Sequence, residues 1–367
     1  GRLEYNFSAL KGLLSGNLLY ELGSGQELKR EFTYVKVVAG QGQYVWRDYN
    51  KDSVEQLNEF ELAIFNDEKL YVRIFTPTSQ YVKAKYSVYN QAISINPKVL
   101  LNQSNVKGLK KLISLFYFQS AVQLNNRFIG QQGIAQYNPF IRSNEDTLLL
   151  NQNSSIINSI FLNRFNNNWG LDYVNTFTAA KTLMTYGVDT RRNNEHLLRS
   201  RVNISRQFTL GLTLRDASRS YSSMFLENRN FLISNQVLEP NITWVFHQNQ
   251  VRIQSGYKLD VRKNHPKYGG EVATANNINF EIRYNIVTTG SINVRGTYTN
   301  ISYNGVSNSS LGYTMLDGLQ NGKNYLWQIN FDKRVSKNIE MSLQYEGRKP
   351  ASTPTVHTGK ATVRAIF

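Results

Sequence analysis

Apolar and polar residues alternate along most of the second half of the chain. Near its end, every second position is apolar over Tyr325–Phe331, Ile339–Tyr345 and Ala361–Phe367. The polar stretch Val335–Asn338 separates the first two of these segments. Because successive side chains on a strand point to opposite faces, each segment has one apolar face and one polar face. The pattern predicts β-strands that border two different environments.

The same alternation extends upstream, in segments that start near Phe208, Ile242, Val251, Ile278 and Ile292. Short polar turns at 205–207, 247–250 and 288–290 alternate with longer polar stretches at 263–273 and 304–318. This spacing predicts consecutive antiparallel hairpins. Short turns at one end and long loops at the other are typical of outer-membrane β-barrels.

The sequence therefore predicts an all-β protein, an antiparallel transmembrane β-barrel of about 14 strands, in a range of roughly 12 to 16. About ten to twelve strands follow Leu109 on this pattern. Two more are expected at Leu13–Leu22 and Leu28–Val38, joined by a turn at Gly23–Gln26. An open sheet edge in lipid leaves backbone groups unpaired, so we expect a closed barrel, from this chain alone or as part of a larger one.

Three regions are expected along the chain. Residues 1–39 form an N-terminal hairpin of the barrel, and 98–367 supply the other transmembrane strands. Residues 40–97 alternate less clearly and contain clustered acidic residues, which indicates an inserted loop or small subdomain. The chain starts at Gly1, with neither Met nor a signal peptide, so we expect a processed chain or the C-terminal part of a longer one.

Composition supports a strand-built membrane protein. Hydrophobic residues make up 41% of the chain, yet no run reaches the roughly 18 to 20 uncharged apolar residues of a membrane-spanning helix. The richest stretch, Leu109–Leu124, is interrupted by Lys110 and Lys111. The 22 Tyr and 19 Phe residues suit interfacial aromatic belts. The absence of Cys excludes disulfides and thiolate metal sites.

The chain is basic, with 42 Lys and Arg, 26 Asp and Glu, and a net charge of +16. Its arginines lie singly on predicted polar faces, and no basic run of five residues occurs, which argues against nucleic acid. Two interpretations remain. The arginines create a positive lumen that favours anions, or they pair across strands with Asp260, Glu281, Glu195 and Asp332 and fill the interior.

One segment has the ligand spacing of a metal site. Asp48, Asn50, Asp52 and Glu59 occupy positions 1, 3, 5 and 12 of an EF-hand calcium loop, and the Val54 carbonyl would occupy position 7. These residues are the candidate ligands of a structural Ca²⁺. Ser53 stands where the motif has Gly, and the preceding residues predict a turn and strand instead of a helix. The alternative is a solvated Asp/Asn turn.

No catalytic motif is present. The four histidines are far apart in sequence, and no Gly-x-Ser-x-Gly elbow occurs. The carboxylate pairs Asp67 with Glu68 and Glu59 with Glu61 are expected to be solvated. We therefore expect a protein that is not an enzyme.

Two blocks carry a resemblance to a known group of proteins. Residues 40–52 with Glu59–Glu61 and Tyr71–Arg73, and the ending with Tyr345–Arg348 and His357–Gly359, resemble segments of large, mostly uncharacterised outer-membrane β-barrel proteins of Bacteroidota. Ala361, Val363, Ala365 and Phe367 are similar to the signal read by the barrel-assembly machinery. The resemblance implies the outer membrane of a Gram-negative bacterium as the location.

These expectations define a function class. The chain is predicted to be a porin-like conduit, or a component of surface assembly or secretion. Its expected partners are outer-membrane lipid, the barrel-assembly machinery and other outer-membrane or surface proteins, with no nucleic acid. The alternative is a soluble β-sandwich module that binds glycans or proteins.

Overall fold

The computed structural model describes residues 1–101, 107–129, 138–140, 149–184, 187–224, 226–248, 250–286 and 289–365. Its long strands are β1 (Arg2–Ala9), β2 (Leu14–Lys36), β5 (Tyr71–Ile95), β6 (Phe116–Ile129), β7 (Leu149–Leu162), β8 (Trp169–Met184), β9 (Gly187–Asn203), β10 (Phe208–Ser223), β11 (Phe231–Phe246), β12 (Val251–Asn264), β13 (Val272–Ile286), β14 (Gly290–Tyr303), β15 (Gly322–Arg334), β16 (Ile339–Lys349) and β17 (Val356–Ala365). The short strands are β3 (Tyr44–Trp46) and β4 (Phe60–Leu62), and the α-helices are α1 (Lys98–Leu101), α2 (Leu109–Ser114) and α3 (Ser310–Leu316). None of these described helices has the length and apolar character needed to cross a membrane.

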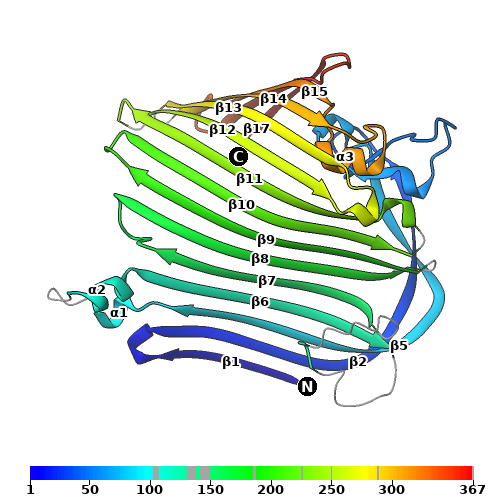
Figure 1. Ribbon diagram of the computed structural model, residues 1–367, viewed down its shortest axis with the longest axis horizontal. Helices are drawn as coiled ribbons and strands as arrows, with labels where there is room; N and C mark the ends of the chain where they lie inside the picture. Colours follow the sequence, from blue (N-terminus) through cyan, green and yellow to red (C-terminus); the bar gives the residue numbers. More distant parts are fainter. Residues whose placement is uncertain are drawn as a thin grey trace.

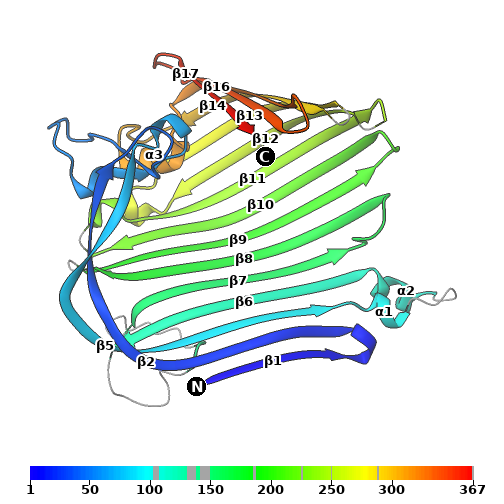
Figure 2. The ribbon, with the colours of Figure 1, turned by 180° about the vertical axis from the view of Figure 1, so that it is seen from behind.

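All described strands belong to one sheet, in which fifteen long strands run antiparallel, apart from one parallel bridge between Arg30 in β2 and Met184 in β8. Strand β1 pairs with β2, β2 with β5, and each strand from β5 onward pairs with the next. In Figures 1 and 2 the strands lie side by side in this order, as a curved sheet. The predicted all-β antiparallel architecture is confirmed.

The described sheet is open, in contrast to the expected closed barrel. Strands β1 and β17 are its two edges, since β1 pairs only with β2 and β17 only with β16 in the described chain. Figure 1 shows them on opposite sides of the sheet. A closed cylinder would therefore need pairing partners for both edges. Phe367, the last residue of the predicted assembly signal, lies outside the described residues.

The sheet has one apolar and one polar face, as the alternation predicts. Trp244 in β11 is opposite Ile253 in β12, which is opposite Ile282 in β13, and the same row continues through Val294, Ile329 and Tyr345. Large side chains on this apolar face are exposed, for example Phe280 at 43% and Ile278 at 54%. No second sheet packs over them in the described structure.

The predicted hairpin between Leu13 and Val38 is wrong. Residues 23–26 continue as strand, so that β2 is one strand of 23 residues paired along its length with the 25 residues of β5. Gly23 lies opposite Tyr86, and a Cβ there would collide with the Tyr86 ring. The glycine therefore makes room for a cross-strand aromatic ring instead of a turn.

The predicted insertion is also shorter than expected, because residues 71–95 belong to the sheet as β5. Strand β6 pairs only with residues 84–95 of β5. The far halves of β2 and β5, residues 28–36 and 71–81, thus continue past β6 as a two-stranded extension, which we call the ribbon. Figure 1 shows the ribbon rising along one end of the sheet toward α3. Residues 37–70, which we call the insert, connect its two strands.

A small apolar core lies at this same end of the sheet. Met315 and Leu316 of α3 are 1% and 2% exposed and pack against Ile233, Ala273 and Ile301. These three strand residues alternate with the apolar-face positions, so α3 covers the polar face of the sheet. The long connection between β14 and β15 is therefore a structured element.

We predict that Leu316→Ala loosens this connection, because it leaves a cavity in the core at a cost of about 2–5 kcal/mol. Faster proteolytic cleavage within residues 304–321 is the expected result. Val306→Ala, at a side chain that is 70% exposed, is the control and should leave cleavage unchanged. Equal cleavage rates for Leu316→Ala and the unsubstituted chain would contradict the assigned packing.

Candidate functional site

The insert is fastened to the ribbon by aromatic packing. Strands β3 and β4 pair as a short hairpin, with Tyr44 opposite Leu62 and Trp46 opposite Phe60. Phe60 stacks on Tyr34 of the ribbon with 3.9 Å between ring centroids and meets Tyr71 edge-on at 5.0 Å. Phe60, Tyr44 and Tyr71 are each less than a tenth exposed. The acidic loop 48–59 is thus held at the tip of a rigid hairpin.

Three of the five candidate metal ligands converge in this loop. Carboxylate oxygens of Asp48, Asp52 and Glu59 lie within 4.8 Å of one another. Asp48 and Asp52 are near the surface, whereas Glu59 is 1% exposed. Glu59 Oε2 accepts a hydrogen bond from the indole Nε1–H of Trp46 at 2.9 Å. The buried Glu59 carboxylate therefore has a fixed position beneath the loop.

The other two candidates contact this cluster through Asp52. The Asn50 amide Nδ2–H donates to Asp52 Oδ2 at 2.8 Å. The backbone N–H of Val54 donates to Asp52 Oδ1 at 2.7 Å, while the Val54 side chain is exposed. In this structure the oxygens of Asp52 are satisfied by protein donors, which also include the Gln56 amide at 2.6 Å.

The sixth residue of the loop shares one backbone feature with calcium loops, although it is Ser instead of Gly. Ser53 is left-handed, with φ of 60°, the region that favours the Gly of the motif. The Ser53 and Asp52 N–H groups donate to Asp48 Oδ2 and Oδ1 at 3.0 and 3.2 Å. These hydrogen bonds stabilise a turn that an L residue adopts at some cost. The loop connects two strands, as the flanking sequence predicts.

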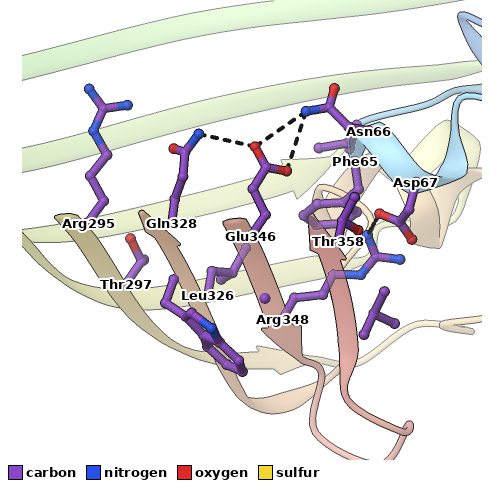
Figure 3. A pocket seen from close by; sticks show the side chains of 14 residues that line it. Phe65, Asn66, Asp67, Arg295, Thr297, Leu326, Gln328, Glu346, Arg348 and Thr358 are labelled. Atoms are coloured by element: carbon purple, nitrogen blue, oxygen red, sulfur yellow. Dashed lines mark hydrogen bonds and ion pairs between the residues drawn. The ribbon is translucent and has the colours of Figure 1, made fainter. Parts of the chain in front are cut away.

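A second part of the insert docks on the polar face of the sheet. The Arg348 guanidinium of β16 forms ion pairs with Asp67 at 2.5 Å and Glu68 at 2.8 Å and lies 4.1 Å from the Phe65 ring centroid. Figure 3 shows Asn66 reaching Glu346, which also accepts from Gln328 on the adjacent strand. The ribbon and insert therefore connect β2 and β5 to β16, across one end of the sheet.

The acidic pairs of the insert are not freely solvated, contrary to expectation: Asp67 and Glu68 are partly buried against Arg348, and the other pair is buried. Glu59 and Glu61 are 1% and 6% exposed. Glu61 Oε2 pairs with Arg229 Nη2 at 2.6 Å, and Glu61 Oε1 accepts from the Tyr49 hydroxyl at 3.2 Å. Residue chemistry alone gave no indication of these pairs, because Arg229 and Arg348 are far away in sequence.

Burial controls the ionisation of these groups. Desolvation raises the pKa of Glu61, and the nearby Arg229 partly offsets that rise. Desolvation likewise raises the pKa of Tyr313, which donates to the Leu62 carbonyl, to about 12. Tyr313 is therefore neutral at ordinary pH, and Glu61 depends on its arginine partner.

Several arginines on the polar face pair with acidic residues, as one of the two interpretations of the basic charge predicts. Arg262 pairs with Asp260 at 2.8 Å, Arg295 with Glu281 at 3.1 Å, and Arg215 with Glu195 at 3.7 Å. Asp332 instead accepts from the Ser342 hydroxyl. Three of the four acidic partners expected from the sequence thus face an arginine.

No protein-family model and no curated protein sequence matches this chain.

We predict that Arg229→Gln weakens docking of the insert by about 3–5 kcal/mol at neutral pH, because it leaves a buried carboxylate without a cation. The folded-state pKa of Glu61 lies above its unfolded value, so ionised Glu61 opposes folding as pH rises through the folded pKa. Below the unfolded pKa Glu61 is neutral, and the substitution should cost less. Protease protection of residues 37–70 between pH 4 and pH 8 measures this.

The matched control is Arg334→Gln, which removes an exposed pair with Glu340. Its expected cost is at most about 1 kcal/mol. An effect of Arg229→Gln that is equally small, or that grows toward pH 4, would contradict the assigned ion pair.

Proposed function

We propose that this chain forms the wall of an outer-membrane β-barrel and acts without catalysis, as a conduit or a surface-assembly component. The uncovered apolar face of the antiparallel sheet carries the proposal. Large apolar side chains exposed over many adjacent strands need an apolar medium. Hydrocarbon supplies that medium, and a barrel wall presents such a face to it.

The extent of the apolar face fits a bilayer. In β13 it runs from Ile278 to Ile286, nine residues or about 30 Å along the strand. A tilt of about 40° reduces this to roughly the 25 Å apolar band of known barrels. Beyond Ile278, the same face continues with Asn276 and Thr274. The end of β13 that lies on the side of the insert and α3 therefore projects from the lipid.

Aromatic residues border this band on both sides. Tyr257, Tyr298 and Tyr325 share one row, and the rings of Tyr298 and Tyr325 are 5.2 Å apart. Phe208 and Trp244 stack at 5.5 Å near the opposite border. Rings that combine an apolar body with a polar edge suit the two membrane interfaces.

The turns give the wall an orientation. Connections such as 204–207 and 335–338 lie at one end of the strands, and the insert and α3 lie at the other. Short turns face the periplasm in outer-membrane barrels, so the insert faces the cell exterior. The insert and ribbon then partly cover the outer mouth, and surface proteins or transported molecules meet them first.

Closure of the wall requires strands at both edges. In lipid, the unpaired backbone groups of β1 and β17 would each cost several kcal/mol. We propose that further strands join these edges in the membrane. The barrel-assembly machinery would bring the strands together, consistent with the alternating pattern at the end of the chain and with the resemblance to outer-membrane proteins of Bacteroidota.

The soluble β-sandwich is less consistent with the arrangement. A sandwich buries the apolar faces of two sheets against each other. Here the described strands form a single sheet, and its apolar face is exposed.

We predict that Phe280→Lys impairs insertion, because a lysine facing lipid costs from about 1 kcal/mol near the interface to about 2–4 kcal/mol at the midplane. Asn279→Lys, one residue away on the polar face, is the control and should insert normally. The fraction of chain that migrates as a heat-modifiable band after folding into liposomes measures both. Equal insertion of the two variants, or salt-extractable protein in cells, would contradict the membrane assignment.

For the acidic loop we propose a structural Ca²⁺ held by Asp48, Asp52 and the buried Glu59. Oxygen ligands at EF-hand spacing and the left-handed Ser53 support this proposal. Asn50 and the Val54 carbonyl would complete the ligand set after the Asp52 contacts rearrange. The ion would brace the insert and would not drive a reaction.

We predict that calcium stabilises the insert by about 2.7 kcal/mol at a hundredfold excess over its Kd. Protease resistance of residues 37–70 should fall with chelator and in the variant Asp48→Ala with Glu59→Ala. Glu55→Gln is the loop control, since Glu55 lies outside the cluster and accepts from the Tyr71 hydroxyl. If protease resistance changes neither with calcium nor with the double substitution, the calcium site is wrong and the loop is an Asp/Asn turn without an ion.

A further inference from the structure

A cavity of about 370 Å³ lies between the ribbon and insert on one side and strands β7 to β11 of the sheet on the other. The ribbon contributes Phe32, Tyr34 and Arg73, and the sheet contributes Arg191 and Tyr221. This volume is within the range of small-molecule sites, which are about 300–1,000 Å³. None of the candidate metal ligands lines the cavity, and neither does Arg348.

The cavity contains more cations than its own acids neutralise. Arg229 pairs with Glu61, but among the described residues no carboxylate forms an ion pair with Arg73, Arg191 or Arg219. The Arg73 guanidinium lies over Phe75 at 4.8 Å, and that of Arg191 lies over Tyr221 at 5.4 Å. These contacts hold the guanidinium groups against rings while leaving hydrogen-bond donors for an anion.

The wall of the cavity also carries neutral hydrogen-bonding side chains. Asn153 and Ser155 of β7 and Thr178 of β8 line it. Amide and hydroxyl groups can both donate and accept hydrogen bonds. They suit a ligand that brings several hydroxyl groups.

These features together specify a ligand with an anionic group, several hydroxyl donors and a ring that can pack on aromatic side chains. We propose that the cavity binds an acidic saccharide of about two rings, with a carboxylate or phosphate facing the arginines. Such a sugar combines all three features in one compact unit. A short acidic peptide would distribute them over several residues. The inference goes beyond the proposed barrel function and does not depend on the sheet spanning lipid.

Calorimetric titration of the purified, detergent-solubilised chain tests the inference. The probes are digalacturonic acid, its uncharged dimethyl ester, lactose 1-phosphate and the dipeptide Asp-Tyr. We expect one of the two acidic sugars to bind at least about tenfold more tightly than the ester and the dipeptide. Which acidic sugar binds identifies the anionic group as carboxylate or phosphate.

The variant Arg191→Gln with Arg219→Gln should weaken acidic-sugar binding at least about tenfold, with the near-ultraviolet spectrum unchanged. Arg283→Gln is the control, because Arg283 lies on the same face of the sheet but near the short-turn end of β13. Equal affinity for acid and ester, tighter binding of the dipeptide, an equal loss in Arg283→Gln, or no binding of either acidic sugar would overturn the inference.

Discussion

Every other feature of this structure follows from an antiparallel sheet whose apolar face carries no second layer of protein in the described part of the chain. Removing apolar surface from water contributes about 25 cal/mol per Å², and this face carries large side chains on many adjacent strands. Within the described chain nothing buries them. The polar face, by contrast, is where the chain folds back on itself, through α3, the ribbon and the insert. The apolar face is thus exposed to the surroundings, and the polar face is where the segments of the chain pack on one another.

The insert shows how the polar face becomes a site. Its position relies on charge pairs that link distant parts of the chain, Arg348 with Asp67 and Glu68, and Arg229 with Glu61. Such pairs fix geometry well even where their net contribution to stability is small. As a result, the ribbon and insert cover one end of the polar face of the sheet. The acidic loop lies on the β3–β4 hairpin of this cover, and the arginine-rich cavity lies beneath it. A molecule that passes this end of the sheet would encounter both.

The sequence was sufficient for features that depend on local pattern. Period-two alternation predicted the strands from Phe208 onward, and the turns at 205–207 and 335–338 follow from their polar composition. The sequence pattern failed at Gly23, because a glycine can mark either a turn or a close approach within a strand. Here Gly23 makes room for the Tyr86 ring, and β2 continues through it. The pattern also failed for β5, which was assigned to the insertion although it pairs with β2 and β6. Both errors concern long-range pairing, which a local pattern does not encode.

In the acidic loop and its surroundings, too, some features follow from local sequence and others depend on contacts between distant segments. Spacing alone singled out Asp48, Asp52 and Glu59, whose oxygens converge. The burial of Glu59 and Glu61 and the arginines around the cavity depend on β9, on the ribbon and on the connection before β11, segments that are distant in sequence. No motif joins such residues, so only the folded arrangement brings them to notice.

The proposed membrane protein has one face of its sheet in contact with lipid and the other in contact with water. The chain has no cysteine, so single spin-labelled cysteines can be placed along β13 without background. In liposomes, labels at positions 278, 280 and 282 should collide mainly with oxygen dissolved in lipid, and labels at 279, 281 and 283 with a water-soluble nickel complex. A period-two alternation between the two relaxation agents is the predicted result. Equal access of the nickel complex to the labels on both faces would contradict contact of the apolar face with lipid.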